Sequence, residues 1–327
     1  MSGLTRKIKY GGTLLLLLAF AAALVYVLPA LRDGRIHVTV VVKSLEKSME
    51  FWQVLSDGVE TAGKEFGVDV AITGPSQESD IDGQIAVLRQ AIAKRPDAIV
   101  MAATDYNRLA PVADDIVKAG IRLIMIDSAV NSRAAVSFIA TDNIEAGRKA
   151  GDEMARLAGG GKIAIISYVQ GTATQIDRER GVRMRLEKEP GTAIVGTFYS
   201  DGVEQKAYET TKRLLLEVPD LRGIVALNET STVGAGRAVQ ELGLAGKVHL
   251  VGFDSSLDEV KLLESGVMQA TVVQKPFNMG YLGVRTAVEA VRGRKVPERI
   301  DTGSVVIDKS NMYSNENQKL LFPFVGK

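Results

Sequence analysis

Short runs of apolar, mostly β-branched residues alternate with helical patterns along most of the chain, beginning at Ile36. Strands that are buried on both faces read as continuous apolar runs of this kind. Between two of the runs, Ile81, Ile85, Leu88 and Ile92 fall on one face of a helix. The predicted strands are residues 36–42, 68–73, 98–102, 122–126, 162–167, 193–199, 223–226, 248–253 and 270–274. Repeated strand–helix units predict parallel sheets with helices on both faces.

The number of strand–helix units indicates two domains. The chain has 327 residues, which is too long for one ordinary core. The pattern also begins again near Lys162, directly after the turn formed by Gly159, Gly160 and Gly161. We therefore predict an α/β protein with two doubly wound parallel-sheet lobes.

The N-terminal segment predicts export from the cytoplasm. Arg6, Lys7 and Lys9 precede an uncharged stretch that runs from Tyr10 to Leu31. A helix of about 20 apolar residues spans the hydrocarbon core of a bilayer, and a basic flank stays on the cytoplasmic side. We expect one transmembrane anchor here. A cleaved signal peptide is the alternative, although the segment lacks a good cleavage site. Both interpretations place the folded part outside the cytoplasm.

The composition excludes several classes of function. The chain has 40 Lys and Arg against 39 Asp and Glu, so no basic excess favours nucleic acid as a partner. It has no cysteine, which removes disulfides, thiolate catalysis, Cys-based metal sites and a lipid anchor on cysteine. The two histidines, His37 and His249, lie within apolar runs. We expect no cofactor and no metal, and no catalysis, since no group with a clear reaction context is present.

Polar residues follow several of the predicted strands at their carboxyl ends. Asp127, Asn228 and Asp254 each come directly after or one residue after such a run, and Gln274 ends another. Open parallel sheets bind ligands at this edge. These side chains are therefore candidates for a binding site.

Seven segments together make the chain resemble the ribose- and galactose-type periplasmic binding proteins, whose fold LacI-type repressors share. In chain order they are FWQVLSDGVE (51–60), IDSA (126–129), IATDN (139–143), DRERG (177–181), ALNE (226–229), VGFD (251–254) and ATVVQ (270–274). The resemblance implies a type I periplasmic binding fold, with two lobes joined by a three-strand hinge. Its boundaries are 1–35 for the anchor, 36–141 plus 275–303 for lobe 1, 142–274 for lobe 2, and 304–327 for a C-terminal strand and tail.

The same resemblance assigns a set of ligand-binding residues. Carboxylates and amides pair with sugar hydroxyls, an Arg fork donates to oxygens, and aromatic rings cover apolar sugar faces. The implied residues are Phe51, Trp52, Asp127, Arg180, Asn228, Asp254 and Gln274. Each also has a structural alternative. Asp254 and Asn228 are suited to capping helices, Arg180 to a solvated helix face, Asp127 to a strand end and Gln274 to the hinge backbone.

Departures from the family pattern indicate a ligand other than plain ribose. The family's ribose binders carry an Asp-Arg pair where this chain has Asp127 and Ser128, so one cation is lost. The first loop, residues 43–50, is longer and more charged than usual.

The resemblance leaves two functions open. The protein delivers a small sugar or polyol to an ABC permease, or it reports the ligand to a membrane sensor kinase or chemoreceptor. A DNA-binding repressor is disfavoured, because a membrane segment stands where a helix-turn-helix would be.

Overall fold

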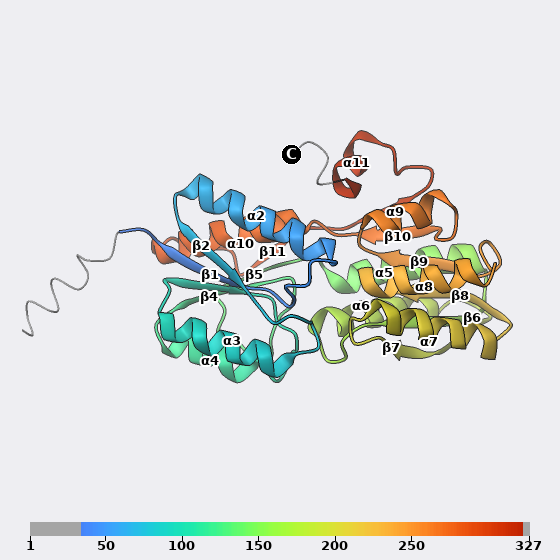
Figure 1. The fold of residues 1–327 in the computed structure, drawn as a ribbon, viewed down its shortest axis with the longest axis horizontal. Helices are drawn as coiled ribbons and strands as arrows, with labels where there is room; N and C mark the ends of the chain where they lie inside the picture. The colour runs from blue at the N-terminus through green and yellow to red at the C-terminus, as the bar shows by residue number, and fades with distance from the viewer. Residues whose placement is uncertain (1–33, 323–327) are drawn as a thin grey trace, which may run out of the picture. The chain divides into compact units, whose positions relative to one another are not determined.

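The computed structural model describes residues 34–322, and within them residues 37–322 belong to one compact unit. Within the described range the strands form two six-stranded sheets, one in each lobe (Figure 1). The predicted transmembrane segment from Tyr10 to Leu31 lies outside the described residues. None of the helices within residues 34–322 combines the length and apolar character needed to span a bilayer.

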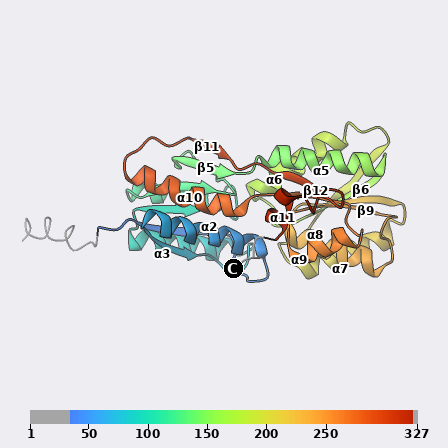
Figure 2. The same cartoon turned by 90° about the horizontal axis from the view of Figure 1, so that it is seen from above.

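The first lobe is built on a parallel sheet with the strand order β11-β5-β4-β3-β1-β2. Its central strands are buried because their sequences are mostly apolar, as in β3, where all four residues are inaccessible. Helices α2 and α10 pack together over one face, and α3 and α4 cover the other (Figures 1 and 2). The elements are β1 (His37–Val41), α2 (Glu50–Phe66), β2 (Asp69–Thr73), α3 (Ile81–Lys94), β3 (Ala98–Met101), α4 (Ala110–Lys118), β4 (Arg122–Ile126), β5 (Ser137–Ala140), α10 (Pro276–Val291) and β11 (Arg299–Asp301).

The second lobe repeats this arrangement with the order β12-β10-β9-β8-β6-β7. Helices α5 and α6 cover one face, and α7 and α8 the other, with α9 beside α8 (Figure 1). The last strand, β12, pairs antiparallel with β10. The elements are α5 (Asn143–Ala158), β6 (Gly161–Ser167), α6 (Ala173–Leu186), β7 (Thr192–Tyr199), α7 (Glu204–Glu217), β8 (Leu221–Ala226), α8 (Glu229–Glu241), β9 (His249–Phe253), α9 (Leu257–Glu264), β10 (Ala270–Val273), β12 (Val305–Asp308) and α11 (Asn315–Leu321).

Three segments connect the two sheets. The chain crosses between β5 and α5, returns between β10 and α10, and crosses again between β11 and β12. The prediction of two parallel-sheet lobes is confirmed, and all nine predicted strands exist. Strands β5 and β11, which lie next to each other at one edge of their sheet, were not among the predicted runs.

Close helix packing within each lobe depends on glycine. A Cβ at Gly58 of α2 would lie 2.1 Å from the Phe277 carbonyl oxygen of α10, and one at Gly147 of α5 would lie 2.2 Å from the Arg178 carbonyl oxygen of α6. Each contact brings backbone against backbone, so the paired helices sit at a distance that only glycine permits.

Candidate functional site

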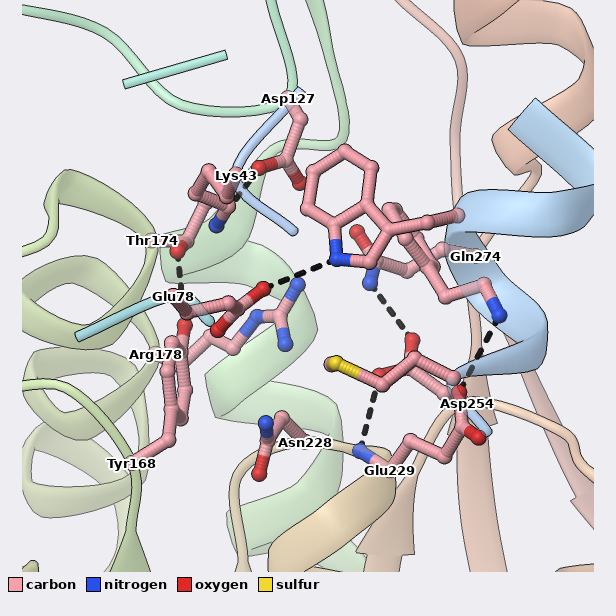
Figure 3. Close-up of a pocket in the computed structure, with 13 residues that line it drawn as sticks. Lys43, Glu78, Asp127, Tyr168, Thr174, Arg178, Asn228, Glu229, Asp254 and Gln274 are labelled. Carbon is pink, nitrogen blue, oxygen red and sulfur yellow. Dashed lines mark hydrogen bonds and ion pairs between the residues drawn. The ribbon is translucent and has the colours of Figure 1, made fainter. Parts of the chain in front are cut away.

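A cavity lies between the lobes, at the carboxyl ends of their parallel strands (Figure 3). This is the edge at which the sequence predicted a site. The first lobe contributes Lys43, Met49, Phe51, Trp52, Glu78 and Asp127, the second contributes Tyr168, Thr174, Arg178, Asn228, Glu229 and Asp254, and Gln274 comes from the crossover after β10. Six of the seven predicted site residues line this cavity.

Asp127 and Asp254 occupy equivalent places in the two lobes. Asp127 follows β4 and Asp254 follows β9, the strands at the same position in each sheet. Both have positive φ angles, 55° and 79°, in a region that residues other than glycine seldom adopt. Both side chains are buried. Backbone strain repeated at two buried carboxylates in one cavity indicates a functional constraint.

Lys43 places a cation beside Asp127, although the absence of the family's Asp-Arg pair had led us to expect one cation fewer in the cleft. Its ammonium group lies 2.8 Å from Asp127 Oδ2, and both side chains are almost fully buried. The Lys43 nitrogen also lies 5.4 Å from the centre of the Trp52 ring. Burial disfavours its charge, but the nearby carboxylates of Asp127 and Glu78 outweigh burial and raise the pKa of Lys43 above its usual value. The charged first loop thus begins with a residue of the site.

The two aromatic residues at the start of α2 differ in burial and in their contacts. Trp52 is 3% exposed and donates its indole N–H to Glu78 Oε1 at 3.0 Å. Phe51 packs edge-on against it, with ring centres 4.9 Å apart, and is less buried. Both rings border the cavity. Burial, partly offset by Lys43, raises the pKa of Glu78, which the sequence analysis had not singled out.

The structure places Arg178, not Arg180, in the cavity. Arg180 is exposed on α6, which agrees with the structural alternative given above, a position on a solvated helix face. Arg178 is 3% exposed, donates to Asn143 Oδ1 at 2.8 Å and to the Leu227 carbonyl at 2.7 Å, and lies over the Phe253 ring. Two residues along a helix turn the side chain by about 200°, so only one of the two can face the cleft.

The remaining predicted residues combine structural and cavity-facing roles. Asn228 caps α8 by accepting the Ser231 N–H at 3.0 Å, and it also lines the cavity. Gln274 donates to Asp254 Oδ1 at 2.6 Å, while its buried Oε1 finds no donor among the described residues. Asp254 does not cap α9. That helix begins instead with a capping box formed by Ser256 and Glu259.

Charge in the cavity is mixed and mutually compensating. Burial raises the pKa of Asp254, and Arg178 opposes that rise. Burial likewise works against the charge of Arg178, yet the Tyr168 hydroxyl and the carboxylate of Asp254 keep its pKa raised. The site therefore presents donors and acceptors on buried side chains. The described part of the chain holds no cluster of His, Cys, Asp and Glu suited to a metal ion.

The lobes touch directly beside the cavity. Thr172 of lobe 2 donates its hydroxyl to the Thr104 carbonyl of lobe 1 at 2.9 Å, and the Tyr106 N–H donates to the Gly171 carbonyl at 2.9 Å. The structure is thus a closed arrangement of the two lobes.

Comparison with known proteins agrees with this architecture. Residues 38–295 match the family model described as a periplasmic binding protein domain. The chain belongs to the periplasmic binding protein family. It is 31% identical over 267 residues to the D-allose-binding periplasmic protein of Escherichia coli, covering 79% of this chain and 85% of that protein. The predicted resemblance to sugar-binding members of this family is confirmed.

Solved structures give the same result. A carbohydrate transporter solute-binding protein from Agrobacterium radiobacter, in complex with D-arabinose, superposes with a TM-score of 0.85 at 32% identity, covering 88% of this chain and 99% of that one. An ABC transporter solute-binding protein from Agrobacterium vitis with bound D-fucose has a TM-score of 0.84 at 34% identity, with coverages of 87% and 99%. The periplasmic binding fold is therefore established for this chain.

Proposed function

We propose that this protein binds a neutral monosaccharide between its two lobes, outside the cytoplasm, and delivers it to an ABC permease. The observation that carries the proposal is the interlobe cavity, which joins carboxylates, a guanidinium, an ammonium, amides and aromatic rings in one buried site. Those groups match the hydroxyl edges and apolar faces of a sugar.

The size of the cavity favours a monosaccharide. The space between its lining atoms is only about 300 Å³ even when the part open to solvent is included, which leaves no room for a chain of sugars. The relatives support the same class, because their names and structures record D-allose, D-arabinose and D-fucose as ligands.

The charges favour a neutral ligand. The cavity contains two cations, Lys43 and Arg178, and four carboxyl groups, those of Glu78, Asp127, Glu229 and Asp254. No cation is left over to compensate a sugar acid or a sugar phosphate, whose burial without a partner is costly.

Delivery to a permease is favoured over sensing. The relatives reported above include transporter binding proteins, and none of them supports the membrane-anchored sensor that the sequence left open. We propose that the segment from Tyr10 to Leu31 exports or anchors the chain. In either case the site faces the outside of the cell.

A thermal-shift screen of the purified protein tests the proposed ligand class. The panel contains D-allose, D-ribose, D-arabinose, D-fucose, D-tagatose, D-galactose, galacturonate and glucose 6-phosphate. A sugar at a hundredfold excess over its dissociation constant should stabilise the protein by about 2.7 kcal/mol. The Asp254→Asn variant serves as the matched control and should lose the shift. A response to the charged sugars alone would refute the neutral class.

A further inference from the structure

A carboxylate from each lobe reaches the N-terminus of a helix in the other lobe. Glu229, the first residue of α8 in lobe 2, accepts the Glu50 N–H at 3.0 Å and the Phe51 N–H at 3.1 Å. These are the first two residues of α2 in lobe 1, and its own cap position, Met49, has no side-chain acceptor. Glu229 therefore caps α2 from across the cleft, satisfying backbone donors that a helix start leaves unpaired.

The contact is reciprocal. Glu50 of lobe 1 accepts the N–H of Leu257 at 3.2 Å, and Leu257 is the first residue of α9 in lobe 2. The dipole of α9 also favours an acidic group such as Glu50 at its N-terminus. All three hydrogen bonds cross the cleft, so they exist only while the lobes are closed.

The same contact gathers carboxyl groups in a dry place. Glu229 is 5% exposed, and Asp254 accepts the Glu229 backbone N–H at 3.1 Å. Glu50 faces it from α2, and the buried Glu259 faces it from α9. The cations of the cavity, Lys43 and Arg178, pair instead with other groups: Lys43 with Asp127, and Arg178 with its acceptors in lobe 2.

Burial of Glu229 on closure changes its protonation. In the closed structure burial, with the charges of Asp254 and Glu50, raises the pKa of Glu229 to about 8, although the N–H groups of Phe51 and Glu50 oppose the rise. When the lobes separate, the carboxyl group meets water and loses the charge of Glu50. Its pKa then returns toward the ordinary value of 4.5.

We propose that Glu229 is a positioning residue that latches the closed lobes through α2, and that closing the latch takes up a proton. This rests on the proposed function, in which ligand binding closes the lobes. The closed state holds the proton more tightly, so closure is favoured at acidic pH and weakens as the pH rises from 4.5 to about 8. One proton per closure corresponds to at most a tenfold change per pH unit.

The absence of cysteine allows a direct measurement of closure. Ser48→Cys and Gln205→Cys place one spin label on each side of the groove between the lobes, where both native residues are exposed. The distribution of distances between the two labels, which shows the fraction of closed protein, is measured by double electron–electron resonance at pH 5.5, 7.0 and 8.5. The measurements are made without ligand and with saturating D-allose, D-arabinose or D-fucose. The unmutated latch should give more closed protein at pH 5.5 than at pH 8.5.

Glu229→Gln decides the assignment. Glutamine keeps the shape and one acceptor oxygen but cannot titrate, so the pH response of closure should disappear. Glu46→Gln is the matched control, since it removes an exposed carboxylate from the same groove and should leave the response intact. An equal pH response in Glu229→Gln, or no response in the protein with Glu229, overturns the proposal. If none of the three sugars closes the lobes at any pH, the proposed function is refuted. The measurements without ligand then still test whether Glu229 controls closure.

Discussion

Replacing Lys43 by methionine should destabilise the protein even without ligand. Lys43 and Asp127 both belong to lobe 1, and their side chains are 4% and 3% exposed. Lys43→Met keeps most of the side-chain volume but leaves Asp127 buried without its cation. Breaking a buried pair from one side costs about 3–5 kcal/mol. Urea denaturation of the ligand-free protein should show a loss of that size.

A double-mutant cycle separates the ion pair from simple loss of packing. Asp127→Asn should also destabilise the protein, because it leaves Lys43 with only Glu78 as a nearby carboxylate. The double variant should be more stable than the sum of the two losses predicts, by roughly 0.5–3 kcal/mol. Lys162→Met is the matched control, since its pair with Asp220 is 46% and 62% exposed and should contribute at most about 1 kcal/mol. Additive losses at Lys43 and Asp127 would refute the reasoning.

The loss in Lys43→Met should also shrink at acidic pH. Lys43 opposes the rise that burial causes in the pKa of Glu78, so without this cation the pKa of a buried carboxyl group such as Glu78 lies further above its unfolded value. Such groups bind protons more tightly when folded, so their protonation stabilises the variant as the pH falls from 8 to 5. A loss that is the same at both pH values would show that the charge of Lys43 is not the cause.

Three further outcomes are expected. Arg178→Met should weaken sugar binding by about 10- to 150-fold in calorimetry, because a hydrogen bond to a charged group contributes about 1.5–3 kcal/mol. Arg180→Ala, which changes an exposed residue, should leave the affinity unchanged. Equal effects of the two substitutions would contradict the placement of α6. Ser256→Ala should lower the free energy of unfolding by about 1 kcal/mol, because it removes the capping box of α9, and it should leave the affinity for sugar unchanged. A loss of binding without a loss of stability would show that Ser256 has another role. Gly147→Ala should weaken sugar binding although Gly147 lies outside the cavity, because the added Cβ would displace the Arg178 backbone. An unchanged affinity in calorimetric titration would show that α5 and α6 can move apart to accommodate the Cβ.

The sequence was sufficient for the architecture because the sheets are buried on both faces. Strands such as β4 read as unbroken apolar runs, and the prediction for that strand agrees with the structure at both ends. Strand β11 could not be found in this way. It has three residues, two of them charged, and it depends on pairing with β5 rather than on its own apolar character.

The site residues were predictable where the strands determined them and less so elsewhere. Asp127 and Asp254 follow strands, and their position at the sheet edge is a consequence of the topology. Arg178 was missed because α6 carries several charges, although its buried face contained a signal. Thr174, Arg178, Gly181 and Val182 repeat at helical spacing, and that spacing excludes Arg180. Lys43 and Glu78 lie in loops that the fold brings together, which no local pattern reveals.

The glycine contacts that join α2 to α10 and α5 to α6 have a consequence for how the ligand preference of such a protein changes. Because backbone meets backbone at Gly58 and Gly147, the helices that carry Trp52 and Arg178 cannot slide to accommodate a new neighbour. Each lobe is a fixed frame. Exchanging one side chain of the cavity therefore changes the contacts at that position and leaves the other lining residues in place. Single substitutions can in this way change which sugar is preferred while the fold stays the same.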